Sequence, residues 1–360
     1  MSEARVFSAP TRIVAGLGAL DRLAGELQAL GSHSVAVVCD EGVASAGLLD
    51  SVLAAMGTDA IVTLPLVRPD PLVADVEAAA AVARAESCDA VVGIGGGSAL
   101  ALAKAVALLL RNDSPITGYA GWNAAPDAPA PVIALPTTAG SGSEVSNALV
   151  LHDPAQASIV VIRGHGYEPR VAILDGRLLR TLPAGPLVDA ALDALSHAVE
   201  ALSVRGASSF TDALALSAAG SLRDALPRVL EKRTDEDLQT LLEASAMANL
   251  ACGSSGLGLV HAISSATRLH VPHGRANGVL LPWVAAFNRE ALRPQALAEA
   301  DRIAPLYERI GFEPSFRPGE LDDEAVASVV EVALASPLHL NNSRHATAGE
   351  LAGLLAGARG

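Results

Sequence analysis

The first half of the chain alternates short β-branched runs with alanine-rich stretches of helical length. Residues 34–40, for example, read Ser-Val-Ala-Val-Val-Cys-Asp, a nearly continuous apolar run of strand length. Parallel strands need long crossover connections and are buried on both faces, so this alternation predicts a doubly wound α/β domain with a parallel sheet. The expected strands are 34–40, 90–94, 132–135 and 171–174, the expected helices are 71–86 and 98–110, and residues 146–162 are expected to form an antiparallel hairpin.

The character of the chain changes around residues 182–186, which read Leu-Pro-Ala-Gly-Pro. Beyond this point strand-like runs nearly vanish, and long alanine- and leucine-rich stretches follow, separated by proline and glycine. Such a pattern is typical of helices. We therefore expect an N-terminal α/β domain over residues 1–184 and an all-α C-terminal domain over residues 185–360, a division that a chain of 360 residues supports.

The charge balance excludes two classes of partner. The chain has 25 basic and 39 acidic residues, whereas nucleic acid or an anionic membrane would require a basic face. Cys39, Cys88 and Cys252 lie far apart with no Cys-x-x-Cys pair, so we interpret them as buried thiols in a reducing compartment. No secretory pattern and no apolar run of membrane-spanning length is evident. We expect a cytoplasmic protein that acts on a small molecule, with a homodimer as the commonest assembly.

A glycine triplet, Gly95, Gly96 and Gly97, is followed by Ser98 and stands between an expected strand and an expected helix. Glycines let the backbone approach a ligand closely, and the N–H groups and dipole of the helix N-terminus favour a pyrophosphate. The pattern is not the Gly-x-Gly-x-x-Gly fingerprint, and a glycine triplet also occurs in ordinary tight turns. Its position between strand and helix favours the phosphate-binding interpretation.

A hydroxyl-rich loop follows the strand expected at 132–135. Its side chains would lie at the carboxyl edge of the sheet, where doubly wound sheets bind ligands, although such a loop can also be a plain turn. The residues are Thr137, Thr138, Ser141 and Ser143.

Asp40 ends the strand expected at 34–40. A carboxylate at such a position can accept hydrogen bonds from ribose hydroxyls and would repel a 2′-phosphate. The alternative is a helix N-cap, since Gly42 and Val43 follow. The first interpretation predicts a preference for NAD over NADP.

Acidic and imidazole side chains with metal-ligand character occur in the second half. Asp193 and His197 are four residues apart, so they lie one turn apart on one face of a helix, and His261, His270 and His273 share one apolar segment. Taken separately, an Asp-x-x-x-His or a lone histidine is more often structural. Taken together, one carboxylate and several imidazoles favour a site for zinc or ferrous iron over calcium or magnesium.

Five stretches carry a resemblance to one family. In the second half they are Asp193-Ala-Leu-Ser-His197, Gly-Leu-Gly-Leu-Val-His261, and Pro-His273-Gly-x-Ala-Asn277 with Leu-Leu-Pro following. In the first half they are Gly95-Gly-Gly-Ser98 with Ala103-Lys104, and Pro136-Thr-Thr-Ala-Gly-Ser-Gly-Ser-Glu-Val145. They resemble the metal and cofactor signatures of the iron-containing (group III) alcohol dehydrogenase family, which also includes maleylacetate reductases.

The resemblance implies that Asp193, His197, His261 and His273 bind one divalent metal ion, either Fe²⁺ or Zn²⁺. It implies a metal-dependent alcohol dehydrogenase or aldehyde reductase that transfers hydride between NAD(H) and a small alcohol or carbonyl compound. The metal would act as the Lewis acid, so no catalytic residue beyond the ligands is required. His270 is the candidate proton relay if it faces the site, and an exposed position is the alternative.

The resemblance also bears on the cofactor. An aspartate at the position of Asp40 goes with NAD in this family, and Asp70 matches a loop near the adenosine. Residues 95–98 would bind the pyrophosphate, and the hydroxyl-rich loop would complete the NAD site.

The sequence departs from the family at three places. An aspartate usual after the glycine loop is replaced by Ala101, a usual lysine before the last strand is missing although Arg163 is close in sequence, and a usual histidine is replaced by Ser265. Three alternatives stay open. They are a maleylacetate reductase-like enzyme without metal, a sugar-phosphate cyclase of the same fold, and a redox-silent NAD-binding homologue. The intact ligand set counts against the first, and the absence of a glutamate-led ligand set and of basic phosphate-binding residues counts against the second.

Overall fold

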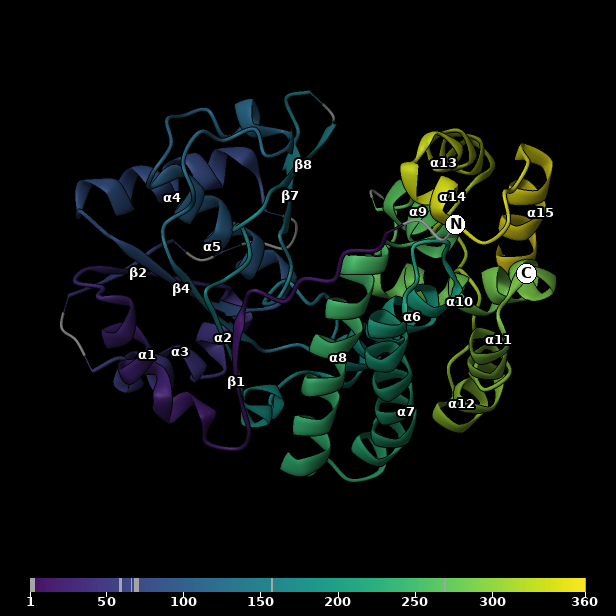
Figure 1. Cartoon of the computed structure of the whole chain (residues 1–360), viewed down its shortest axis with the longest axis horizontal. Coiled ribbons are helices and arrows are strands. Elements are labelled where there is room, and N and C mark those ends of the chain that lie inside the picture. The colour runs from purple at the N-terminus through teal and green to yellow at the C-terminus, as the bar shows by residue number, and fades with distance from the viewer. Residues whose placement is uncertain are drawn as a thin grey trace. The chain divides into compact units, whose positions relative to one another are not determined.

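A computed structural model describes residues 4–57, 60–65, 67, 71–156, 158–268 and 270–359. The chain divides into two compact units. One comprises residues 9–138 and 142–182, and the other comprises residues 1–8, 139–141 and 183–360. Figure 1 shows strands in the first unit and a set of helices in the second. The candidate cofactor residue Asp70 lies outside the described residues.

The first unit is built on a six-stranded, all-parallel sheet with the order β1-β9-β6-β4-β2-β3. The central strands β2 and β4 are buried at every position because they consist of small aliphatic residues that suit a sheet covered on both faces. The strands are β1 (Arg12–Ala15), β2 (Val35–Cys39), β3 (Ile61–Thr63), β4 (Ala90–Gly95), β6 (Val132–Pro136) and β9 (Val171–Leu174).

The crossover helices of this unit are short except for two. α5 is buried at every position from Ala99 to Leu109, as expected for a helix that is apolar all round, and it packs with α4 into one hydrophobic core. The helices are α1 (Leu23–Leu30), α2 (Glu41–Ser45), α3 (Leu48–Ala55), α4 (Val73–Ala85) and α5 (Gly97–Leu109), with 3-10 turns at Ala19–Arg22, Ile116–Tyr119 and Gly176–Leu179.

The first unit also contains a second, three-stranded sheet, two strands of which lie between β6 and β9 in the chain. It consists of β5 (Gly121–Trp122), β7 (Ala148–Asp153) and β8 (Ser158–Arg163), in the order β5-β8-β7. β7 and β8 pair antiparallel, from Ala148 opposite Arg163 to Asp153 opposite Ser158. This is the predicted hairpin.

The buried Lys104 of α5 holds the start of this hairpin. Its ammonium donates hydrogen bonds to the carbonyl oxygens of Ser143 (3.0 Å), Ser146 (3.1 Å) and Ala148 (2.6 Å). The charge of Glu144, which is also buried, favours the protonated form of Lys104. Burial lowers the pKa of Lys104 to about 7 and raises the pKa of Glu144 to about 7.

The second unit consists of helices in its described residues, and α6, α7 and α8 pack side by side in it (Figure 1). α7 begins with a capping box at Ser208 and Thr211, and α8 begins with Thr234 as N-cap. The helices are α6 (Ala184–Ser203), α7 (Ser209–Glu231), α8 (Asp235–Ser255), α9 (Leu259–Ala266), α10 (His273–Asn288), α11 (Pro294–Ala300), α12 (Ile303–Ile310), α13 (Asp323–Ala335), α14 (Pro337–Asn341) and α15 (Ala348–Arg359), with a 3-10 turn at Arg289–Ala291.

The predicted fold class, an α/β domain with a parallel sheet followed by an all-α domain, is confirmed. Among the described residues no single helix is long and apolar enough to cross a membrane. Only α8 and α9 taken together, with a bend of 99° between them, reach the required length and apolar composition.

Candidate functional site

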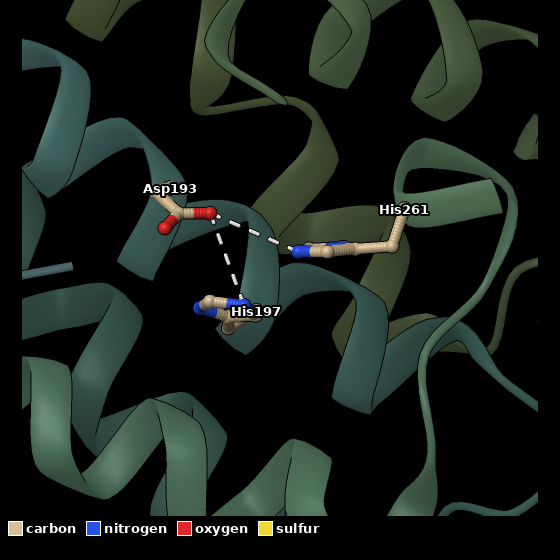
Figure 2. Close-up of side chains that lie close together, drawn as sticks. All are labelled: Asp193, His197 and His261. Atoms are coloured by element: carbon tan, nitrogen blue, oxygen red, sulfur yellow. Dashed lines mark ion pairs between the residues drawn. The ribbon is translucent and has the colours of Figure 1, made fainter. Parts of the chain in front are cut away.

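Two of the predicted metal ligands lie on α6. Asp193 and His197 are one turn apart, and Nε2 of His197 lies 3.8 Å from Oδ1 of Asp193. His261, on α9, brings its own Nε2 to 3.8 Å from the same oxygen. The rings of His197 and His261 stack with their centroids 4.5 Å apart. Figure 2 shows both imidazoles directed toward the Asp193 carboxylate.

These three side chains form a group that can hold a metal ion. One ligand atom from each lies within 4.8 Å of the others, and the residues are only 4%, 5% and 3% exposed. Ligand atoms of a tetrahedral zinc site lie about 3.4 Å apart, given metal–ligand bonds near 2.1 Å. The distances of 3.8 Å from Oδ1 of Asp193 to Nε2 of His197 and of His261 are close to this value, so this group is compatible with a bound metal ion.

His273, the fourth predicted ligand, is the first residue of α10. Its ring lies edge-on to His261 with the centroids 5.5 Å apart. Asn277, one turn further along α10, places its amide nitrogen 2.6 Å from Oδ1 of Asp193. The same nitrogen is 3.1 Å from Nε2 of His261 and 3.2 Å from Nε2 of His273. The Asn277 contact therefore shows that His273 faces the same small volume as Asp193 and His261.

Around the side-chain amide of Asn277 there are more hydrogen-bond acceptors than hydrogens to donate. The NH₂ group of Asn277 has two hydrogens and meets three potential acceptors, so it cannot serve all of them at once. Its own Oδ1 is buried and has no hydrogen-bond partner within the described part of the chain. A cation would satisfy the surplus of acceptors, and the residues present therefore fit a metal ion.

The electrostatics of the group also favour a cation. Burial alone would raise the pKa of Asp193, but the neighbouring imidazoles hold it well below its usual range. Burial lowers the pKa of His197 to about 4. Burial and the Arg268 guanidinium lower the pKa of His273 to about 3. Asp193 is thus a carboxylate at neutral pH, and two imidazoles are neutral, which is the form that binds metal.

His261 behaves differently from the other two histidines. Burial lowers its pKa, but its interactions with Asp193 and Glu200 outweigh this effect and raise the pKa to about 9. Because a metal ligand must be deprotonated at the nitrogen that binds the ion, a divalent cation would compete with a proton for Nε2 of His261.

Several of the predicted cofactor residues follow or end strands of the parallel sheet at its carboxyl edge. The chain runs from β2 outward to β3, then crosses back to β4 and continues to β6 and β9, so the direction of winding changes between β2 and β4. Ligands of doubly wound sheets bind beyond the carboxyl ends of the strands at such a point. Asp40 follows β2, and residues 95–98 follow or end β4.

Contacts at this edge are close. The amide of Thr137, which follows β6, donates to the carbonyl of Gly95 at 3.0 Å. A Cβ on Gly96 would lie 3.4 Å from Thr138. Gly96 is the N-cap of α5, whose first turn contains Gly97 and Ser98, so the predicted phosphate loop does open a helix. Asp40 caps α2 by accepting from the amide of Val43 at 2.8 Å through Oδ1, which leaves Oδ2 directed toward Gly95.

Gly95 cannot carry a side chain without strain. Its φ is +146°, and a Cβ there would lie 2.6 Å from Cβ of Ala99 and 2.8 Å from Oδ2 of Asp40. We expect Gly95→Ala to lower the free energy of unfolding by roughly 1–3 kcal/mol. Denaturant titration would measure the change, with Gly118→Ala as the control because nothing lies within 4 Å of its Cβ position. Equal effects of the two substitutions would contradict the tight packing inferred at Gly95.

The hydroxyl-rich loop is divided between the two units. Ser143 is buried in the α/β unit and uses its carbonyl to accept from Lys104, whereas Ser141 is exposed and belongs to the helical unit with Ala139 and Gly140. The carbonyl of Gly140 accepts from Asn249 (3.0 Å) and Ser245 (3.3 Å) of α8. These bonds fix the middle of the loop to the unit that carries the metal ligands.

The structure also shows where His270 and Ala101 lie. His270 is exposed in the turn before α10, and its role as a proton relay stays a prediction. Ala101 is buried in the hydrophobic core around α5, where a carboxylate would be surrounded by apolar side chains. Asn277, in contrast, belongs to a motif recognised in the sequence, but its contact with three ligand atoms was not predicted.

Two family models match the chain. The model for iron-containing alcohol dehydrogenase matches residues 10–176, and the model for the C-terminal part of the same family matches residues 187–358. The chain is 38% identical over 299 residues to a probable alcohol dehydrogenase, EutG, of Salmonella typhimurium, covering 81% of this chain and 75% of that protein. It is 35% identical over 311 residues to an NAD-dependent methanol dehydrogenase of Bacillus methanolicus, covering 85% and 80%.

Solved structures agree with these matches. A sulfoacetaldehyde reductase from Bifidobacterium kashiwanohense, solved with NAD⁺, has a TM-score of 0.90 and 29% identity, and 99% of each chain is covered. A maleylacetate reductase from Agrobacterium tumefaciens has a TM-score of 0.85 and 25% identity, again with 99% of each chain covered. The recognised kinship with both alcohol dehydrogenases and maleylacetate reductases is therefore confirmed.

The matches also confirm the predicted class of activity, an oxidoreductase acting on CH–OH groups. The predicted cofactors agree with them, since the family is iron-containing, relatives include an NAD-dependent enzyme, and Asp193, His197 and His261 can hold an ion. Both halves of the chain match, and each of the two relatives is covered over more than two thirds of its length. The chain belongs to the iron-containing alcohol dehydrogenase family.

Proposed function

We propose that this protein interconverts a small alcohol and its aldehyde or ketone, with NAD(H) and one divalent metal ion bound by Asp193, His197, His261 and His273. The observation that carries the proposal is the convergence of a buried carboxylate and imidazoles from α6, α9 and α10 on one small volume. Two relatives, EutG and the methanol dehydrogenase, carry names of alcohol dehydrogenases, which supports a small alcohol as substrate.

The chemistry is divided between the cofactors and the chain. When bound, a divalent ion supplies Lewis acidity that lowers the pKa of an alcohol, and NAD supplies the hydride acceptor. Asp193 contributes one negative charge and the three histidines are neutral donors, so the bound ion keeps a net positive charge of about one. That charge favours a negatively charged substrate oxygen. Burial of the ligands keeps bulk water from screening it.

The NAD site is proposed at the carboxyl edge of the parallel sheet, beyond β2, β4 and β6. Residues 95–98 would hold the pyrophosphate at the N-terminus of α5, and the hydroxyl-rich loop, with Thr137, Thr138, Ser141 and Ser143, would surround the rest of the dinucleotide. Asp40 would accept hydrogen bonds from the ribose. The NAD⁺-bound reductase and the NAD-dependent methanol dehydrogenase support this choice of cofactor. Asp70 is proposed to lie near the adenosine of the cofactor, and this proposal depends only on the resemblance to the family.

We expect NAD to be preferred over NADP, and Asp40→Gly to narrow the preference. Repulsion between Asp40 and a 2′-phosphate in a partly solvated site is worth roughly 1 kcal/mol or more, about a fivefold difference in affinity. Asp40 also caps α2, so its replacement by Asn, which keeps the cap without the charge, is the matched control for folding. Ratios of kcat/KM for NAD and NADP would measure the effect. Equal use of both cofactors by the wild type would contradict it.

One experiment separates the candidate functions. The purified protein would be analysed for iron and zinc, and NADH oxidation would be followed with a panel of small aldehydes and ketones. Metal-dependent turnover is the expected result. Turnover of maleylacetate that survives removal of the metal would favour the maleylacetate reductase-like alternative, and NADH binding without turnover would favour a redox-silent homologue.

The assembly and location stay proposals. Cys39, Cys88 and Cys252 are all buried and form no disulfide with one another, which supports a reducing compartment such as the cytoplasm. A homodimer is the assembly we propose, and light scattering would test it.

A further inference from the structure

Glu200 lies on α6, one turn beyond His197, and is 3% exposed. Its two carboxylate oxygens accept three hydrogen bonds from α9 and the residue that caps it. Oε1 accepts from the amide of Val260 at 2.7 Å, and Oε2 accepts from the amide of Gly258 at 3.1 Å. Oε2 also lies 2.7 Å from Nδ1 of His261. The same carboxylate thus caps the N-terminus of α9 and contacts the imidazole that α9 contributes to the metal site.

The contact with His261 fixes which ring nitrogen carries the hydrogen. A carboxylate with two amide donors already bound to it acts as an acceptor, so Nδ1 of His261 is the donor in this pair. The lone pair of the neutral ring is then on Nε2. That nitrogen faces Oδ1 of Asp193 at 3.8 Å and is the ligand atom of the group. Glu200 therefore holds His261 in the tautomer that a metal ligand requires.

Close packing leaves Glu200 little freedom. A Cβ on Gly258 would lie 3.0 Å from Oε1 of Glu200, so the glycine is needed for the approach of the carboxylate to α9. At the same helix end, the amide of Leu259 donates to Oδ1 of Asn342 at 3.3 Å. Two side chains thus cap α9, and of these Glu200 contacts His261, whereas the contacts of Asn342 are with Leu259, Asn288 and Arg344.

We propose that Glu200 is a positioning residue for the metal site, which orients His261 and directs its Nε2 lone pair toward the ion. The inference rests on the metal-dependent function proposed above. It goes beyond capping, because a cap alone would stabilise α9 without selecting a tautomer. Hydrogen-bonded partners of metal-bound imidazoles typically change metal affinity by about 10- to 100-fold when they are removed.

The test is Glu200→Gln, compared with Asn342→Ala as the matched control at the same helix end. The glutamine amide can keep one oxygen acceptor, but its NH₂ group would face Nδ1 of His261 as a donor and favour the tautomer with hydrogen on Nε2. Co²⁺ affinity of the full-length metal-depleted protein would be measured by competition with a chromophoric chelator, together with the melting temperature. We expect Glu200→Gln to bind Co²⁺ about 10- to 100-fold more weakly, and Asn342→Ala to bind within about twofold of the wild type.

A spectroscopic signature separates positioning from capping. In the Co²⁺-loaded wild type, the Nδ1 hydrogen of His261 is expected to give a paramagnetically shifted, slowly exchanging proton resonance, because Glu200 protects it. This resonance should be lost or exchange rapidly in Glu200→Gln and persist in Asn342→Ala. Glu200→Asp, which keeps a carboxylate on a shorter stem, should lose less affinity than the glutamine variant.

Other outcomes would overturn the inference. If Glu200→Gln and Asn342→Ala lose Co²⁺ affinity in equal measure, or if the glutamine variant binds as the wild type does, Glu200 is a helix cap alone. If Glu200→Gln does not fold, the same comparison is made between Glu200→Asp and Asn342→Ala, and equal affinities again refute positioning. A wild type that binds no Co²⁺, Zn²⁺ or Fe²⁺ would instead refute the metal-dependent function itself.

Discussion

Replacing Asp193 with alanine is expected to remove most of the bound metal and to lower turnover by about a thousandfold or more. Asp193 is the one carboxylate in the group, and its Oδ1 lies 3.8 Å from Nε2 of both His197 and His261. Without it the ion would meet neutral donors only. A Lewis acid contributes several kcal/mol to transition-state stabilisation, and about 4 kcal/mol corresponds to a thousandfold in rate.

The measurement is metal content by mass spectrometry together with kcat for NADH oxidation. Asp301→Ala is a suitable control because it removes an exposed carboxylate whose partner, Arg289, is also exposed. NADH binding should be unchanged in both variants, since Asp193 is not among the residues proposed to bind the cofactor. Full metal occupancy in purified Asp193→Ala would refute its role as a ligand, and so would wild-type turnover.

The second large effect concerns stability. Lys104→Met is expected to lower the free energy of unfolding by about 3–5 kcal/mol, because it removes the hydrogen-bond donor of three carbonyl oxygens inside the unit, at about 1–3 kcal/mol for each one left unsatisfied. These oxygens belong to Ser143, Ser146 and Ala148. The segment they belong to follows the proposed cofactor loop, so NADH affinity should fall as well.

Urea titration and NADH fluorescence would measure these two consequences. Lys232→Met is the control, since Lys232 is the only other lysine of the chain and is exposed. A loss of less than about 1 kcal/mol for Lys104→Met would show that an uncharged side chain can replace the buried ammonium. The three hydrogen bonds from Lys104 to the start of the hairpin would then contribute little to stability.

The fold was largely predictable because the central strands are buried on both faces. β2 and β4 are continuous runs of small apolar residues, and the predicted ends of both strands agree with the observed ends to within one residue. β1 and β3 were not predicted. They have four and three residues, and β1 is exposed along most of its length, so neither produces a continuous apolar run. Their place in the sheet depends on pairing with β9 and β2, which local sequence does not encode.

The sequence predicts those site residues that are close together in the chain or belong to a recognised motif. The spacing of Asp193 and His197 follows from the helical repeat, and the structure brings His261 to them. Glu200 and Asn277 escaped prediction, because their roles depend on the approach of α9 to α6 and of α10 to α6. Lys104 escaped for a similar reason, since a lysine in an apolar helix does not reveal that three carbonyls of a distant segment surround it.

The proposed donors of the metal site come from three helices, and His273 follows Asp193 by 80 residues in the chain. An unfolded chain does not bring these donors together, so an ion held by them would bind the native state and shift the folding equilibrium by mass action. At a free ion concentration a hundred times the dissociation constant, this linkage is worth about 2.7 kcal/mol. The ion that activates the substrate would therefore also act as a folding ligand. Its supply during expression, or its removal by a chelator during purification, would set how much native protein accumulates.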